Sequence, residues 1–106
     1  MHNKNFKITP ITYKYGVSNK VLSLRKKIDR VDAKIIHLLN KRSTYSLKIG
    51  NIKDRECVHI EQPLREREIV TNIINNNCGP MSTKEILEIY VIILDSSKRI
   101  QKDPYI

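Results

Sequence analysis

Residues 19–54 read NKVLSLRKKIDRVDAKIIHLLNKRSTYSLKIGNIKD, and this stretch decides the fold. Hydrophobic residues recur in it at alternating intervals of three and four residues, the spacing of one face of an α-helix. The pattern lasts for more than four heptads without a proline, with Arg42 in one slot and Gly50 as the only weak helix former. The sequence predicts one long helix with Ser18 as its N-cap. The apolar stripe comprises Val21, Leu24, Ile28, Val31, Ile35, Leu38, Tyr45, Ile49 and Ile52.

The length of this helix has a consequence for assembly. At 1.5 Å per residue it is on the order of 50 Å long. A compact chain of 106 residues has a radius of gyration of only about 13 Å. A helix this long needs cover from beyond its own chain, so the sequence predicts dimerisation.

Two short helices are predicted after the long one. Pro63 suits the first position of the second helix, and Gly79 follows its expected end. Ser82 with Glu85 three residues later forms a capping box that opens the third helix. The Asp103-Pro104 pair ends it. No strand of consequence is needed, so the prediction is an all-α fold.

Composition and length limit the possible classes of protein. One domain fits 106 residues, and we expect an extended arm at 1–17 before a helical domain at 18–106. No apolar run approaches the roughly 20 residues that cross a bilayer, and residues 1–20 hold no apolar signal core. Cys57 and Cys78 are expected to be free thiols. These features favour a cytoplasmic protein without a membrane partner.

The net charge of +9 makes a basic nucleic-acid-binding helix an alternative. Aromatic residues make up only 6% of the chain and none is Trp, so base-stacking surfaces are poorly supplied. Asp29 and Asp32 partly balance the basic residues, as on the solvated face of a coiled coil. We therefore favour cations gathered around a small anion. The residues of the alternative are Arg25, Lys26, Lys27, Arg30 and Lys41.

Two cations lie on or near the stripe of the long helix. Arg42 occupies a stripe position, where a buried guanidinium needs an anionic partner; the alternatives are that it extends to the surface or pairs with a carboxylate. Lys53 lies eleven residues later, about 16 Å along the axis and within roughly 20° of the same face. Both side chains are long enough to converge on one dianion. The other interpretation of Lys53 is a partner of the helix C-terminal dipole.

Polar residues on the short helices face the same region. Glu66 extends the stripe of the second helix inward beside Arg65, although a first-turn glutamate is also favoured by the helix dipole. Ser97 takes a stripe position of the third helix, with Gln101 as its i+4 neighbour. Ser97 alone is also explained as a serine bonded back to its own helix. Together these residues predict a cation-rich ligand pocket inside a helical bundle.

Arg25 poses a geometric problem for such a pocket. It lies seventeen residues before Arg42, about 25 Å away along one straight helix and roughly 100° around it. One small ligand cannot be held by both residues of one chain. If Arg25 belongs to the site, it comes from an antiparallel partner; otherwise it is a solvated surface residue.

The sequence contains no pattern typical of a metal site, a phosphate-binding loop or a nucleophile elbow. His37 and His59 have no second ligand at i+3 or i+4, so a metal site is not expected. The three glycines lie apart, at Gly16, Gly50 and Gly79, and form neither a phosphate-binding loop nor a nucleophile elbow.

In five segments the sequence resembles the all-helical (AroQ-class) chorismate mutases. The segments occur in the family's order and spacing and together extend over roughly residues 21–102. The resemblance implies three helices per chain, one very long and two short, that form an intertwined helical homodimer with two shared sites. The segments are Leu24–Asp32, Leu38–Arg42, Ile49–Lys53, Pro63–Glu68 and Ser97–Gln101.

The resemblance also implies roles for individual residues. Arg42 and Arg25 of the partner subunit would hold the two carboxylates of chorismate. Lys53 would contact a carboxylate and the ether oxygen, to which Gln101 would also donate a hydrogen bond.

Glu66 would accept a hydrogen bond from the ring hydroxyl, while Arg65 and Ser97 would complete the carboxylate contacts. Gln62 replaces an aspartate that family members usually carry before the second helix. Glutamine is a poor N-cap, so this turn is expected to be looser or its side chain expendable.

The resemblance implies an isomerase that converts chorismate to prephenate, in the biosynthesis of phenylalanine and tyrosine, without covalent catalysis and without metal or cofactor. Catalysis would consist of holding the reactive conformer and stabilising charge on the ether oxygen. The alternatives are an isochorismate-pyruvate lyase of the same fold and a non-catalytic dimerisation module.

Overall fold

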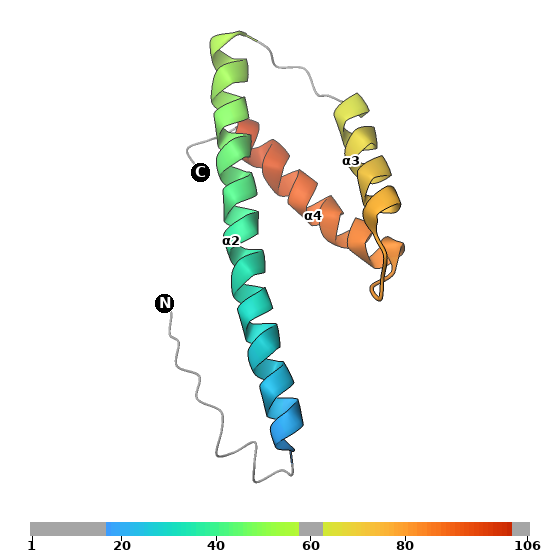
Figure 1. The fold of residues 1–106 in the computed structure, drawn as a ribbon. Helices are drawn as coiled ribbons and strands as arrows, with labels where there is room; N and C mark the ends of the chain where they lie inside the picture. Colours follow the sequence, from blue (N-terminus) through green and yellow to red (C-terminus); the bar gives the residue numbers. More distant parts are fainter. Residues whose placement is uncertain (1–16, 58–62, 103–106) are drawn as a thin grey trace. The chain divides into compact units, whose positions relative to one another are not determined.

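The computed structural model describes residues 17–57 and 63–102, and within these ranges it contains three helices and no strand (Figure 1). The long helix α2 extends over Asn19–Arg55, α3 over Pro63–Asn76 and α4 over Thr83–Lys102. The predicted all-α fold is therefore confirmed. Residues 1–16 of the arm predicted at 1–17, together with His59 and Gln62, lie outside the described residues, as does the predicted stop at 103–104.

The capping signals of the sequence are present in the structure. The Ser18 hydroxyl accepts a hydrogen bond from the backbone N–H of Val21 at 3.3 Å, which confirms it as the N-cap of α2. At the start of α4, the N–H of Glu85 donates to the Ser82 hydroxyl at 3.1 Å, and that hydroxyl donates to the Glu85 carboxylate at 2.8 Å. The carboxylate also accepts a hydrogen bond from the backbone N–H of Ser82 at 3.3 Å, and the two bonds donated by Ser82 hold the pKa of Glu85 below its ordinary value.

The link between α3 and α4 explains where α3 ends. Gly79 adopts a positive φ of 75°, a backbone conformation that favours glycine. Asn77 closes the same turn, because its side-chain amide donates to the Met81 carbonyl and to the Thr83 hydroxyl, both at 3.0 Å. The helix stop predicted at these residues is confirmed by the end of α3 at Asn76.

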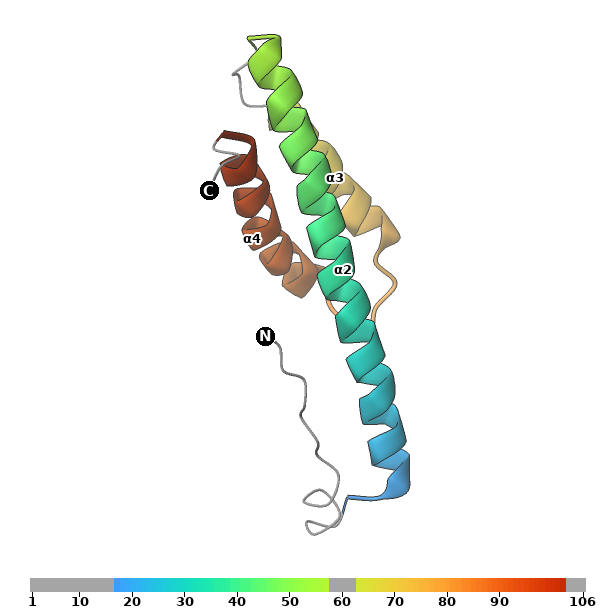
Figure 2. The same cartoon turned by 90° about the vertical axis from the view of Figure 1, so that its left-hand side faces the viewer.

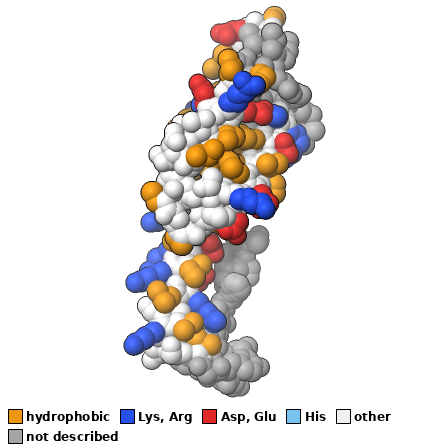
Figure 3. Space-filling model, turned by 90° about the vertical axis from the view of Figure 1, so that its right-hand side faces the viewer, with side chains coloured by type: hydrophobic (Ala, Val, Ile, Leu, Met, Phe, Trp, Pro, Cys, Tyr) orange, Lys and Arg blue, Asp and Glu red, His pale blue; other side chains and the backbone are white. Residues whose placement is uncertain are grey.

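The N-terminal half of α2, residues 19–39, carries its apolar stripe on the surface. Leu24 is 58% exposed and Ile28 is 57% exposed, and no residue of this half is buried. Figure 3 shows hydrophobic side chains interleaved with Lys and Arg on this part of the helix. These apolar side chains find no cover within residues 17–39.

The C-terminal half of α2 belongs with α3 and α4 to a second unit, residues 40–106. Here α4 packs against α3, and the C-terminal end of α4 lies beside α2 (Figures 1 and 2). Side chains of α4 accept hydrogen bonds from side chains of α2. The buried positions of α2 are Ser46 and Gly50, whereas Tyr45 and Ile49 of the apolar stripe remain exposed. Among the described residues no hydrophobic side chain is fully buried.

Among residues 17–57 and 63–102, no helix combines the length and the apolar composition that crossing a bilayer requires.

Candidate active site

Two cations of α2 meet two polar side chains of α4. Arg42 donates a hydrogen bond through Nη1 to the Ser97 hydroxyl. Lys53 donates through Nζ to Oε1 of Gln101 at 2.9 Å. All four residues are half-buried. The structure thus joins in two pairs, between the same two helices, four of the residues that the sequence analysis assigned to one pocket.

The close approach of α4 to α2 depends on small side chains. Ser46 and Gly50 lie one turn apart on the face of α2 between Arg42 and Lys53, and Ser46 is only 6% exposed. A Cβ atom added at Gly50 would lie 2.7 Å from both Cα and the carbonyl oxygen of Gln101. Any side chain at this position would therefore push the end of α4 away from Lys53.

Ser97 serves both of the roles considered for it. Its hydroxyl donates to the carbonyl of Ile93 at 3.0 Å, which is the bond back to its own helix. The same oxygen accepts the hydrogen bond from Arg42. The back-bond therefore orients the hydroxyl oxygen as an acceptor toward α2.

Gln101 is oriented by its contact with Lys53. Because Oε1 accepts from the ammonium group, the amide nitrogen of Gln101 remains the donor end of the side chain. The pair thus provides two hydrogen-bond donors, an ammonium and an amide, within one short distance.

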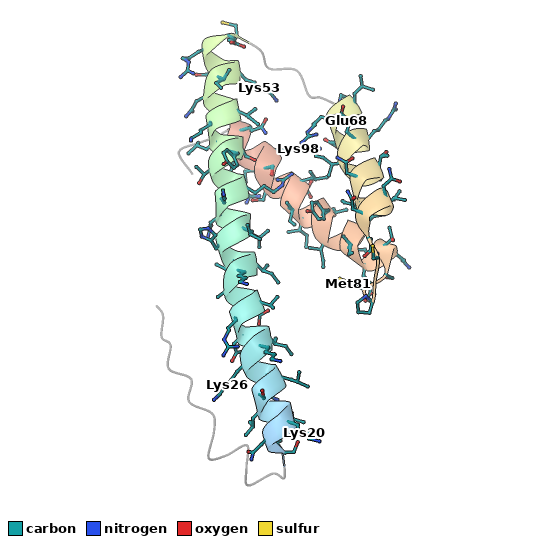
Figure 4. The ribbon with its side chains drawn as sticks, viewed as in Figure 1. Lys20, Lys26, Lys53, Glu68, Met81 and Lys98 are labelled. Atoms are coloured by element: carbon teal, nitrogen blue, oxygen red, sulfur yellow. The ribbon has the colours of Figure 1, made fainter. Side chains whose placement is uncertain are left out.

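Glu66, on α3, contacts a residue of α4 that lies next to Ser97. Its carboxylate forms an ion pair with Lys98, with 2.8 Å between Nζ and Oε2. Lys98 directly follows Ser97 in the sequence, and its side chain extends from α4 toward α3 (Figure 4). Glu66 is in the first turn of α3, where the positive end of the helix dipole also favours its charge.

The other predicted site residues are not in this cluster. Arg65 pairs with Glu68 at 3.3 Å, and both side chains are more than 60% exposed. Arg25 is exposed in the N-terminal half of α2, and Gln62 lies outside the described residues.

The chemistry of the cluster follows from its donors. Guanidinium and ammonium groups bind carboxylates, while hydroxyl and amide groups fix the orientation of a ligand. Among residues 17–57 and 63–102, no three His, Cys, Asp or Glu side chains are grouped so that they could hold a metal ion. Both cysteines are free and exposed. The arrangement suits a small anion with more than one acceptor.

Three contributors were missed by the sequence analysis. Ser46 and Gly50 were hidden because the apolar stripe gives the stronger periodic signal, although small residues at i and i+4 between two cations were a usable sign. Lys98 lies within the segment Ser97–Gln101, but no role was predicted for it because its partner Glu66 lies on another helix.

Comparison with known proteins gives a family match over most of the chain. The model of the family described as chorismate mutase type II matches residues 24–102. The bifunctional chorismate mutase/prephenate dehydratase of Aquifex aeolicus is 36% identical over 83 residues, which cover 74% of this chain and 23% of that protein. The chain thus spans about a quarter of the length of this bifunctional relative.

Two further relatives are similar over most of their own length. The chorismate mutase of Methanocaldococcus jannaschii is 31% identical over 85 residues, 78% of this chain and 85% of that protein. The solved structure of chorismate mutase form II from Thermus thermophilus superposes with a TM-score of 0.75 at 26% identity. It covers 80% of this chain and 97% of the other.

Proposed function

Because the chain belongs to the chorismate mutase type II family, we propose that it catalyses the rearrangement of chorismate to prephenate. In this reaction a carbon–oxygen bond breaks and a carbon–carbon bond forms within one molecule. No group is transferred to the protein, so the site has to hold the folded substrate and stabilise charge on the ether oxygen.

The observation that carries this proposal is the Lys53–Gln101 pair. An ammonium and a neutral amide donor, adjacent and half-buried, suit an ether oxygen that gains negative charge as its bond to carbon breaks. Gln101 has no proton to lose or gain near neutral pH, so this donor stays in place across that range.

The substrate's carboxylates and hydroxyl have partners nearby. Arg42, oriented by Ser97, would bind one carboxylate, and Lys53 would add a contact. Glu66 would accept a hydrogen bond from the ring hydroxyl. Arg65 would complete the carboxylate contacts after leaving Glu68, an exposed partner that holds it weakly.

The second carboxylate would be held by Arg25 of the partner subunit, in an intertwined homodimer. The exposed apolar stripe of α2 supports this proposal, because a second copy of the helix would cover it. Gln62, which precedes α3 in the sequence, would contact the substrate hydroxyl.

The proposed setting is the biosynthesis of phenylalanine and tyrosine in the cytoplasm. The relatives that match this chain include enzymes that join this mutase to a prephenate dehydratase. Two exposed free thiols fit a reducing compartment.

The test is incubation of the purified protein with chorismate and, separately, with isochorismate, followed by identification of the products. We expect prephenate from chorismate and no pyruvate from isochorismate. Pyruvate release without prephenate would favour the lyase. Absence of both, with salt-sensitive binding to duplex DNA, would favour the basic nucleic-acid-binding alternative.

A further inference from the structure

We propose that Lys98 is a positioning residue of the site, which neutralises Glu66 so that this carboxylate can lie beside a dianionic substrate. The inference rests on the proposed function, since only a dianion with a hydroxyl group gives Glu66 this task.

The geometry of the ion pair carries the first step. Lys98 extends from α4 to reach Glu66 on α3, with 2.8 Å between Nζ and Oε2. On α4 its two nearest site residues are Ser97, its sequence neighbour, and Gln101, one turn further on. The ion pair therefore adjoins the wall of the proposed site.

Stability alone does not account for the pair. The side chains of Lys98 and Glu66 are 41% and 40% exposed, and ion pairs of this exposure contribute little to folding. The contact with Lys98 also fixes which way the Glu66 carboxylate points. A role in the site explains its position better than a role in the fold.

Charge supplies the second step. A carboxylate that accepts a hydrogen bond from the substrate hydroxyl also repels the substrate's two carboxylates. An ammonium held against the carboxylate cancels most of this repulsion and leaves a free lone pair for the hydroxyl. Removal of Lys98 would leave Glu66 as a bare negative charge next to the dianion.

The experiment compares steady-state kinetics of the wild-type protein, Lys98→Met, Lys98→Arg and Lys98→Met/Glu66→Gln with chorismate. We expect Lys98→Met to raise KM by about tenfold, with a smaller change in kcat. Lys98→Arg keeps the charge and should stay near the wild-type KM. Adding Glu66→Gln to Lys98→Met removes the uncovered charge and should lower KM again.

The controls separate this role from others. Arg99→Met removes a cation from the neighbouring exposed position and should leave KM unchanged. The KM increase of Lys98→Met should also shrink at high salt, because screening weakens repulsion. Melting temperatures of all variants show whether the helices remain intact.

Three results would overturn the inference. One is an unchanged KM for Lys98→Met, and another is an equal KM increase for Arg99→Met. The third is a double variant with a KM no lower than that of Lys98→Met, as a purely structural role of Lys98 would give. A wild-type protein that releases no prephenate would instead remove the proposed function, and the inference with it.

Discussion

The two halves of α2 share one helical pattern but differ in what covers them. In residues 19–39 the apolar stripe lies on the surface and no residue is buried. In residues 40–55 the small residues Ser46 and Gly50 are buried, and the cations on the same face are hydrogen-bonded to α4. The C-terminal half thus has hydrogen-bond partners within its own chain, whereas the N-terminal half leaves its apolar stripe exposed, which is why we propose a second copy as its cover.

The comparison also separates two kinds of helix face. The face of α2 toward α4 carries the small residues Ser46 and Gly50 and the cations Arg42 and Lys53. The two cations are hydrogen-bonded to side chains of α4. The apolar stripe beside it includes Tyr45, Ile49 and Ile52, which are all more than 40% exposed. Apolar area left in water is costly, so this face is available for assembly.

The largest expected effect on activity comes from removing a cation from the C-terminal half of α2. Lys53→Ala or Arg42→Ala should lower kcat by about 10²-fold or more, because each removes a donor aimed at developing or fixed negative charge. Circular dichroism should show unchanged helix content. Lys41→Ala, an exposed neighbour, is the matched control. Mild effects at both Lys53 and Arg42 would remove the site assignment.

A carboxylate in the stripe of the N-terminal half should act on assembly instead. Ile28→Asp places an unpaired charge where a second copy would pack, so the dimer should dissociate about 10- to 100-fold more readily. Analytical ultracentrifugation measures this. Ser23→Asp adds the same charge on roughly the opposite side of the helix and should leave assembly unchanged. Equal behaviour of the two variants would contradict a packed stripe.

Gly50→Ala should have a smaller effect on activity. Its direction is the opposite of what the helix propensities of glycine and alanine alone would suggest. Alanine favours a helix over glycine by about 1 kcal/mol, so an open position would be stabilised. Here the added Cβ meets the backbone of Gln101, which shifts the end of α4 and should lower kcat about tenfold. Asn51→Ala is the exposed control. Higher stability with full activity would show that α4 does not approach this closely.

The smallest effect concerns the start of α4. Because the pKa of Glu85 is lowered in the folded protein, the ionised carboxylate stabilises the fold above the ordinary value of 4.5. This stabilisation is lost as the pH falls through the lower folded pKa. Glu85→Gln should therefore lower the melting temperature slightly at pH 7 and have no effect at pH 2. An equal decrease at both pH values would exclude the capping role.

Local rules were sufficient for much of this fold. The caps at Ser18 and Ser82 and the stop at Gly79 depend on neighbours within four residues, so the sequence predicted them correctly. Arg42 and Ser97 were predicted to face one pocket because both interrupt an apolar stripe, and in the structure they are hydrogen-bonded to each other. A polar residue on an apolar stripe needs a polar partner, and few residues on the other helices could provide one.

The remaining features depend on contacts that periodicity does not encode. Ser46 and Gly50 carry little hydrophobic signal, so their part in the contact between α2 and α4 was not predicted. The Lys98–Glu66 pair depends on how α3 and α4 pack together. The role of Arg25 depends on a second chain, and it stays a prediction.

The most direct test of a site shared between two copies is subunit mixing. Arg25→Ala and Lys53→Ala should each be inactive alone. Refolded together in equal amounts, they form mixed dimers in which one of two sites is intact. The mixture should regain about a quarter of wild-type activity. A mixture as inactive as its components would show that Arg25 and Lys53 act within one chain, and would contradict the account.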